Sequence, residues 1–300
     1  MRSKIDPTFN KKLATVFTTS FLNDYLTNSY QDKLKEILNE TGLIHRLPTY
    51  ATVEQTLELI YKYLSQNYRF EYVYKNTVAN QLLLKKHSLK KAILFSEFRA
   101  GISQLDLLIV NGTTTAYEIK TELDSLSRLP VQLNSYTEMF DKTFVVTHEA
   151  FAVKVERLLP ESAGLMVLNQ NNRLFTLKEA RSNVGQLNHA AMFSSLRKAE
   201  YCSLIREKFD KVPNMPNTKI YDYCLNLFKQ LPNIEAHESF VKVLRKRKLK
   251  DEQLDLVKSV GAALKMLCLG KHFTGAECTQ LHNTFNSKPF PPYVHALSQR

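Results

Sequence analysis

Hydrophobic and polar positions divide the chain into a helical first part, a strand-rich middle and a helical last part. Up to about residue 90, apolar residues recur at helical spacing, as in Leu57, Ile60 and Leu64. Thr52 and Gln55 precede this run at the spacing of a capping box, which predicts where the helix begins. In the last third of the chain the apolar spacing is helical again. The pattern therefore predicts a strand-rich core with a helical region before it and another after it in the chain.

The middle of the chain carries short runs rich in β-branched and aromatic residues. In order, the pattern predicts a helix over Val73–Leu84, strands over Ile93–Arg99, Leu105–Val110 and Thr114–Thr121, a helix over Leu126–Phe140 and a strand over Thr143–Thr147. Asn111-Gly112 separates the second and third strands and is a strong hairpin signal, so these strands are expected to be adjacent and antiparallel. The order predicts an α/β core whose last strand returns by a crossover.

These changes of pattern predict three regions. An N-terminal helical region covers residues 1–68, the α/β core covers residues 69–185 and a C-terminal helical region covers residues 186–300. Two further strands, near Gly164–Asn169 and Arg173–Leu177, are expected to complete the core.

Charge and cysteine content narrow the class of protein. Lys and Arg number 41 against 29 acidic residues, giving a net charge of +12, which favours an anionic partner such as nucleic acid. A basic protein without such a partner is the alternative. The 4 cysteines form no C-x-x-C pair, and no apolar run has the length of a membrane span. We therefore expect a cytoplasmic protein that does not bind membranes.

Three charged residues stand within the apolar strands of the predicted core: Asp106, Glu118 and Lys120. Alternation along a strand places Glu118 and Lys120 on one face, and the hairpin can bring Asp106 beside them. Burying ionised groups is costly unless they pair or bind a metal. A buried structural salt bridge is the alternative to a functional site here.

Two carboxylates and one ammonium at one point suit the hydrolysis of a phosphodiester. Asp106, Glu118 and the backbone carbonyl of Ile119 would supply oxygen ligands to Mg²⁺ or Mn²⁺. The ion would polarise the phosphoryl group and activate a water molecule, and Lys120 would orient that water or stabilise the developing charge.

At these residues the sequence resembles the PD-(D/E)XK nuclease superfamily. Asp106 is followed after eleven residues by Glu118-Ile119-Lys120, and Gln132-x-x-x-Tyr136 lies on the next helix, similar to the nuclease domain of RecB exonuclease. A bacterial branch of the superfamily is also similar over residues 68–150. Leu105 stands where the motif has proline. The resemblance implies a restriction-endonuclease-like mixed sheet with the element order αβββαβ.

The resemblance also implies an enzyme, a divalent-metal-dependent nuclease acting on DNA in preference to RNA. Asp106, Glu118 and Lys120 would be catalytic, with a further acid supplied by Glu97 or Glu71, and Glu97 preferred. Gln132, Tyr136 and Arg128 would contact the substrate. Ordinary helix packing is the alternative for Tyr136, and a salt bridge to Glu122 or Asp124 is the alternative for Arg128.

Two other classes of function stay open at this point. The first is a non-catalytic nucleic-acid-binding or regulatory protein on the same fold. The second is a subunit that acts with a partner protein or as a homo-oligomer, as in phage-defence or mobile-element systems. The basic run Arg245–Lys250 either follows a nucleic-acid backbone or is a solvated helix end.

Overall fold

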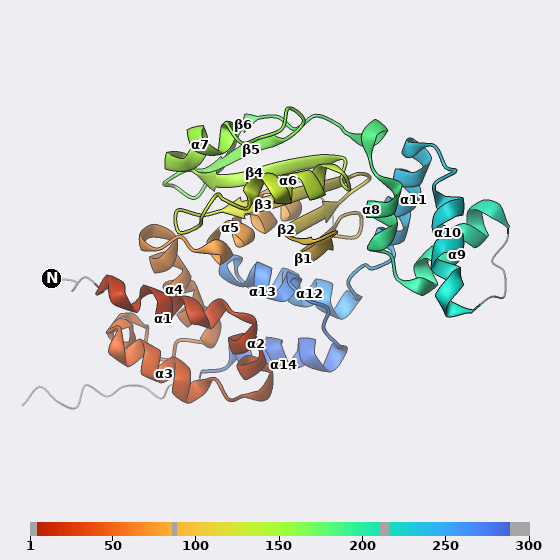
Figure 1. Cartoon of the computed structure of the whole chain (residues 1–300). Helices are drawn as coiled ribbons and strands as arrows, with labels where there is room; N and C mark the ends of the chain where they lie inside the picture. Colours follow the sequence, from red (N-terminus) through yellow and green to blue (C-terminus); the bar gives the residue numbers. More distant parts are fainter. Residues whose placement is uncertain (1–4, 86–88, 211–215, 289–300) are drawn as a thin grey trace, which may run out of the picture. The chain divides into compact units, whose positions relative to one another are not determined.

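The computed structural model describes residues 5–85, 89–210 and 216–288 (Figure 1). The chain divides into two compact units. One combines residues 1–80 with residues 249–300, and the other is residues 81–248. The two units therefore meet at 80/81 and 248/249, and not at the predicted domain boundaries 68/69 and 185/186. Those domain boundaries stay a prediction.

The first unit is helical and is built from both ends of the chain. Its helices are α1 (Asn10–Ala14), α2 (Thr19–Thr27), α3 (Gln31–Glu40), α4 (Val53–Asn67), α5 (Glu71–Val78), α12 (Asp251–Ser259), α13 (Lys265–Leu269) and α14 (Gly275–Asn286). The predicted capping box of Thr52 and Gln55 is present at the start of α4. The Tyr72 hydroxyl donates to the Ala263 carbonyl at 2.6 Å, and the Met266 N–H donates to the Asn76 side chain at 3.0 Å. These bonds join α5 to the C-terminal segment.

The second unit contains a six-stranded mixed sheet, which confirms the predicted α/β class. The strands are β1 (Ile93–Ala100), β2 (Ser103–Val110), β3 (Thr114–Lys120), β4 (Lys142–His148), β5 (Gly164–Leu168) and β6 (Leu174–Lys178). They lie side by side in chain order, and β3, β4 and β5 are mutually parallel while the other pairs are antiparallel. The predicted hairpin at Asn111-Gly112 joins β2 to β3, and Gly112 has a φ of +110° that favours glycine.

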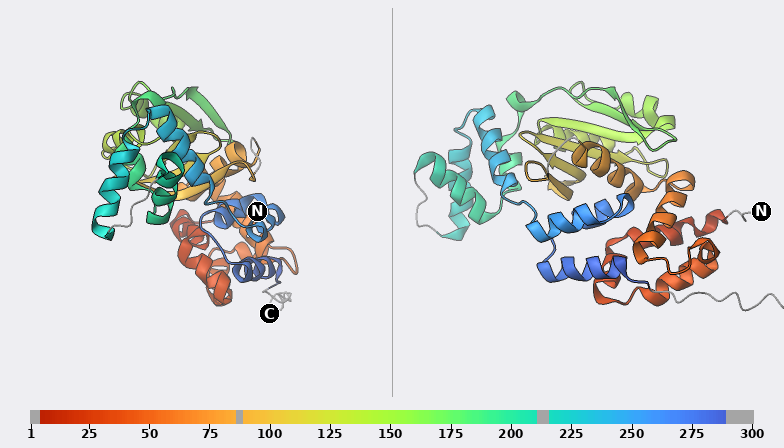
Figure 2. Two further views of the ribbon diagram at one scale, coloured as in Figure 1. Left: turned by 90° about the vertical axis from the view of Figure 1, so that its right-hand side faces the viewer. Right: turned by 180° about the vertical axis from the view of Figure 1, so that it is seen from behind.

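Helices supply the crossovers and cover the sheet. They are α6 (Leu129–Thr137), α7 (Ala152–Glu156), α8 (His189–Ser194), α9 (Lys198–Phe209), α10 (Asn217–Phe228) and α11 (Asn233–Arg245). Helix α6 packs on β2 and β4, α7 packs on β4 and β5, and α11 contacts β2. Figures 1 and 2 show α8–α11 gathered at one end of the sheet. Helix α6 begins only at Leu129, later than predicted, and Pro130 occupies its first turn, where no backbone donor is needed.

One continuous apolar core joins the sheet to these helices. Leu108, Val145 and Leu165 on the strands pack with Phe140 after α6 and with Phe193 on α8, and all five are fully buried. The expected helix over Val73–Leu84 is α5 followed by a π-helical stretch, Ala79–Leu84. Within the described ranges, no helix combines the length and apolar composition that a membrane crossing requires.

Candidate functional site

Glu118 and Lys120 form a closed ion pair on one face of β3, as alternation predicts. Every residue of β3 is buried, and the side chains of Glu118 and Lys120 are only 2% and 11% exposed. Lys120 Nζ lies 2.6 Å from Glu118 Oε1, and the Tyr136 hydroxyl, which carries a single hydrogen, lies 2.8 Å from Glu118 Oε2 and 2.9 Å from the Gln104 carbonyl oxygen. Burial raises the pKa of the Glu118 carboxyl, and the Lys120 ammonium opposes that rise. Both carboxylate oxygens of Glu118 therefore lie within hydrogen-bond distance of a protein group.

Asp106 stands beside this pair on β2. The β2–β3 ladder ends at the pair Leu107 and Tyr117, one step before Asp106 and Glu118 would face each other. The half-buried Asp106 carboxylate instead accepts the Ile119 N–H at 2.7 Å. The Asp106 side chain thus accepts the Ile119 N–H in place of a backbone carbonyl of the neighbouring strand. The predicted neighbourhood of Asp106, Glu118 and Lys120 is present, and each acid is already engaged by protein donors.

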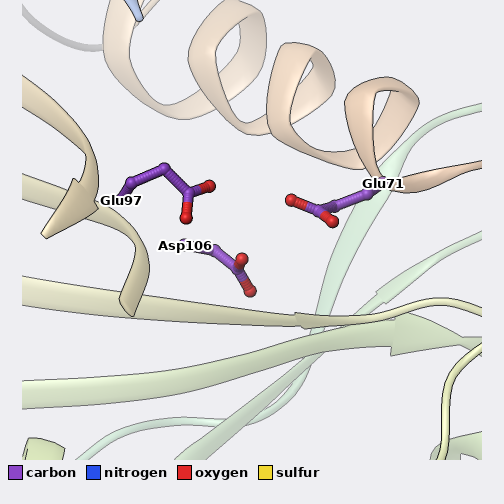
Figure 3. Close-up of side chains that lie close together, drawn as sticks. All are labelled: Glu71, Glu97 and Asp106. Atoms are coloured by element: carbon purple, nitrogen blue, oxygen red, sulfur yellow. The ribbon is translucent and has the colours of Figure 1, made fainter. Parts of the chain in front are cut away.

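Glu97 lies across from Asp106 on β1, where the β1–β2 ladder skips one pair. Its φ is +56°, a left-handed conformation that non-glycine residues rarely adopt. The Gln104 side-chain amide donates to Glu97 Oε2 at 2.8 Å. Carboxylate oxygens of Glu97 and Asp106 lie within 4.8 Å of each other, and Figure 3 shows both side chains pointing into the same space. Glu71, the other candidate acid, begins α5 and belongs to the first unit.

The residues predicted to contact substrate differ in their surroundings. Tyr136 is fully buried, and its hydroxyl lies beside Glu118, so a contact with substrate stays a prediction. Gln132 is half-buried, and its Oε1 atom has no hydrogen-bond partner among the described residues. Arg128 is exposed immediately before α6, and in the described part of the chain it forms no salt bridge with Glu122 or Asp124.

Protein groups already contact the acids of the predicted Mg²⁺ ligand set. The two Glu118 oxygens lie 2.6 Å from Lys120 Nζ and 2.8 Å from the Tyr136 hydroxyl. The acids of this unit that come within 4.8 Å of each other are Glu97 and Asp106 instead. A divalent cation takes six or more oxygen ligands, and two carboxylates supply only part of that set. Binding of Mg²⁺ or Mn²⁺ stays a prediction.

A second polar network, which the sequence pattern did not single out, fixes the β2–β3 turn. The buried Asp141 carboxylate, just before β4, accepts the Thr113 hydroxyl at 2.6 Å and the Asn183 N–H at 3.1 Å. Thr114 Oγ1 lies 3.0 Å from His237 Nε2 on α11. These contacts hold the turn against α11. Asp141 and His237 are far apart in sequence and share no motif spacing, so no local signal could have paired them.

Comparisons with known proteins identify relatives of another kind. The family model described as "Bacteriophage P4 protein cII" matches residues 65–263, about two thirds of the chain. "Protein cII" of Enterobacteria phage P4 is 29% identical over 129 residues, which cover 42% of this chain and 49% of that protein. The alignment thus spans about half the length of this relative. No solved structure matches the chain.

These matches correct the prediction of an enzyme. The chain was expected to be a metal-dependent nuclease, a hydrolase with Asp106, Glu118, Lys120 and Glu97 as catalytic residues. The family that matches most of the chain, and the curated relative within it, are those of a phage protein cII and not of a nuclease. The prediction of nuclease activity is therefore wrong. The three charged residues were correctly placed near one another, but the pattern could not distinguish a reactive cluster from a closed one.

Proposed function

Because the chain belongs to the bacteriophage P4 protein cII family, we propose that it is a non-catalytic, nucleic-acid-binding regulatory protein. The observation that carries this proposal is the closure of the charged cluster. Glu118 is bonded through both oxygens to Lys120 and Tyr136, and Asp106 is bonded to the backbone of Ile119. Groups held in this way stabilise the sheet, which is a structural role that requires no reaction.

Charge supports nucleic acid as the partner. The excess of 12 positive charges is a property of the whole chain, and the buried pair of Glu118 and Lys120 contributes nothing to it. The excess must therefore lie mainly on accessible side chains, where it attracts polyanions at long range. Self-association or a protein partner stays open as a further property.

We also propose that the core of the second unit is of the restriction-endonuclease-like type, used here without the nuclease reaction. The order β1, β2, β3, α6, β4 supports this, together with the antiparallel β2–β3 hairpin and the parallel crossover to β4. A fold of this kind does not determine function, which depends on the site it carries.

Binding and cleavage are tested in one experiment. The purified full chain is mixed with fluorescently labelled duplex DNA, single-stranded DNA or RNA at low salt, with Mg²⁺, Mn²⁺ or EDTA. We expect binding by fluorescence anisotropy in all three buffers and intact nucleic acid on denaturing gels. Absence of binding to every nucleic acid would refute the nucleic-acid part of the proposal. Cleavage that disappears in a Lys120→Met variant would refute the non-catalytic part.

A further inference from the structure

A basic pocket of about 570 Å³ lies within the second unit, away from the charged cluster of β3. Its walls come from the segment before β1, the β2–β3 turn and the end of α11 with the residues that follow it. Six cationic side chains line it: Lys90, Lys91, Lys242, Arg245, Lys246 and Lys248. Ile93, Gly112 and Val241 complete the lining together with a single acid, Glu238.

The charge of the lining is strongly unbalanced. Six cations against one carboxylate leave a net charge of +5 around one hollow. Lys242 also pairs with Glu207 on α9, which reduces its share of this excess. Like charges gathered in a concave surface raise the local potential and concentrate anions there. An arrangement of this kind is favourable when an anion with several negative groups occupies it.

The residues of the basic run Arg245–Lys250 do not all line the pocket. Arg247 points elsewhere: its guanidinium donates to both oxygens of Glu200, at 2.7 Å and 2.5 Å, and to the Ser195 carbonyl at 3.0 Å. It is a structural residue that joins the end of α11 to α9. Arg245, Lys246 and Lys248 turn toward the pocket instead. The run thus divides into a structural arginine and three cations that line the pocket.

Stabilisation of the α11 helix dipole explains only part of the pocket. Cations in the last turn of a helix are favourable, which accounts for Lys242 and Arg245. It does not account for Lys90 and Lys91, which come from a segment more than 150 residues earlier in the chain and also line the pocket. Two segments far apart in the sequence thus contribute cations to one hollow.

We propose that this pocket binds the phosphate backbone of duplex DNA, independently of base sequence. This inference rests on the proposed nucleic-acid-binding function and locates it. Lysine and arginine side chains neutralise phosphates. Among the described residues that line the pocket none is aromatic, so these residues offer no platform on which unpaired bases could stack. The ligand is therefore a backbone with regularly spaced phosphates and stacked, paired bases.

The pocket is held in shape by the network around Asp141. The Thr113 hydroxyl is bonded to Asp141, and Thr114 contacts His237, so the turn that carries Gly112 is fixed against α11. Two walls of the pocket thus keep their spacing without a ligand. A preformed site loses less conformational entropy when it binds.

Charge removal with a matched control tests the proposal. We compare the wild-type full chain with two pocket variants, Arg245→Ala/Lys246→Ala/Lys248→Ala and Lys90→Ala/Lys91→Ala. The control is Lys154→Ala/Arg157→Ala/Lys229→Ala, which removes three exposed cations from α7 and the end of α10. Circular dichroism verifies that each variant is folded. Affinity for a 20-base-pair duplex of random sequence is measured by anisotropy between 50 and 200 mM NaCl.

The expected effect follows from counterion release. Each phosphate contact contributes a slope of about 0.9 to log affinity against log salt concentration. Loss of three contacts lowers the slope by about 2.7, and the affinity at 0.1 M salt by between about 10-fold and 500-fold. The double variant is expected to lower the slope by about 1.8. The control variant should change the affinity by less than about 3-fold.

The outcomes separate this inference from the proposed function. If wild type binds duplex DNA and the pocket variants weaken it no more than the control does, the pocket assignment is wrong and the proposed function stands. If wild type binds no nucleic acid, the proposed function itself fails. Equal or tighter binding of single-stranded DNA or RNA by the pocket would overturn the choice of duplex. Release of bound duplex by 1 mM inorganic phosphate, with sodium chloride at equal ionic strength as the control, would assign the pocket to a small phosphate ligand.

Discussion

Replacement of Lys120 by methionine tests whether the charged cluster of β3 is closed. Methionine keeps the length and most of the volume of the lysine side chain but removes its charge. Glu118, whose side chain is 2% exposed, would then keep uncharged partners such as the Tyr136 hydroxyl but lose the ammonium. Breaking a buried ion pair in this way costs about 3–5 kcal/mol, because one charge stays buried without compensation. We therefore expect Lys120→Met to lower the free energy of unfolding by about that amount.

Urea denaturation followed by far-ultraviolet circular dichroism measures this loss, because the chain contains no tryptophan to report by fluorescence. The control is Lys229→Met, which removes an exposed lysine and should change stability by less than about 0.5 kcal/mol. The double variant Glu118→Gln/Lys120→Met completes a mutant cycle. It should be more stable than Lys120→Met alone, because the uncompensated charge is gone.

The pH dependence gives an independent readout. Burial already raises the folded-state pKa of Glu118, and loss of Lys120 removes the charge that opposes this rise. An acid whose pKa is higher in the folded state than in the unfolded state stabilises the fold at a pH below its unfolded-state pKa. This stabilisation is lost as the pH rises through the folded-state pKa. The deficit of Lys120→Met should therefore be small near pH 4 and large at pH 7. A deficit below about 1 kcal/mol at pH 7 would mean that water reaches Glu118, and the closed-cluster argument would be wrong.

Three further predictions address neighbouring residues. Tyr136→Phe removes the hydroxyl bonded to Glu118 and should lower the free energy of unfolding by about 1–3 kcal/mol in the same assay; an unchanged midpoint would contradict it. Glu97→Gly relieves a φ of +56° and should raise stability by about 1 kcal/mol, whereas Glu97→Gln, which keeps the backbone cost, should gain less; equal gains would assign the effect to charge. Burial lowers the pKa of His237, so stability should fall as pH drops below the ordinary value of 6.5, and His237→Leu should abolish that step; a step that persists in His237→Leu belongs to another group.

Much of the fold could be predicted because its signals are local. The hairpin at Asn111-Gly112, Pro130 in the first turn of α6 and the capping box at Thr52 are each determined by a few neighbouring residues, and all are present. The strands agree with the predicted ranges to within two residues at either end. Joining of the two ends of the chain in one helical unit depends on packing between segments about 200 residues apart, and no local pattern encodes it.

The sequence predicted where the charged residues of the candidate site lie, but the nuclease activity predicted for them was wrong. Sequence alternation placed Glu118 and Lys120 on one face, and the hairpin placed Asp106 beside them, but neither pattern shows how the side chains satisfy one another. That depends on distances such as the 2.6 Å between Lys120 and Glu118. The sequence indicated only one part of the basic pocket, the run Arg245–Lys250. Its other wall, Lys90 and Lys91, joins it through the tertiary structure alone.

The proposed non-catalytic role is consistent with a structural use of this cluster, which favours the correct register of β3. The side-chain period of a strand is two, so a slip of one residue would move Glu118 and Lys120 to the opposite face. There the Tyr136 hydroxyl and the Asp106–Ile119 bond could no longer be made. Each buried charge left without its partner would cost several kcal/mol, far more than a displaced apolar side chain. The correct register also sets the β2–β3 turn, and that turn carries Gly112 into the wall of the basic pocket. A single charged pair in the centre of the sheet can thus keep a distant DNA-binding surface in shape, and Lys120→Met should weaken DNA binding even though Lys120 lies outside the pocket.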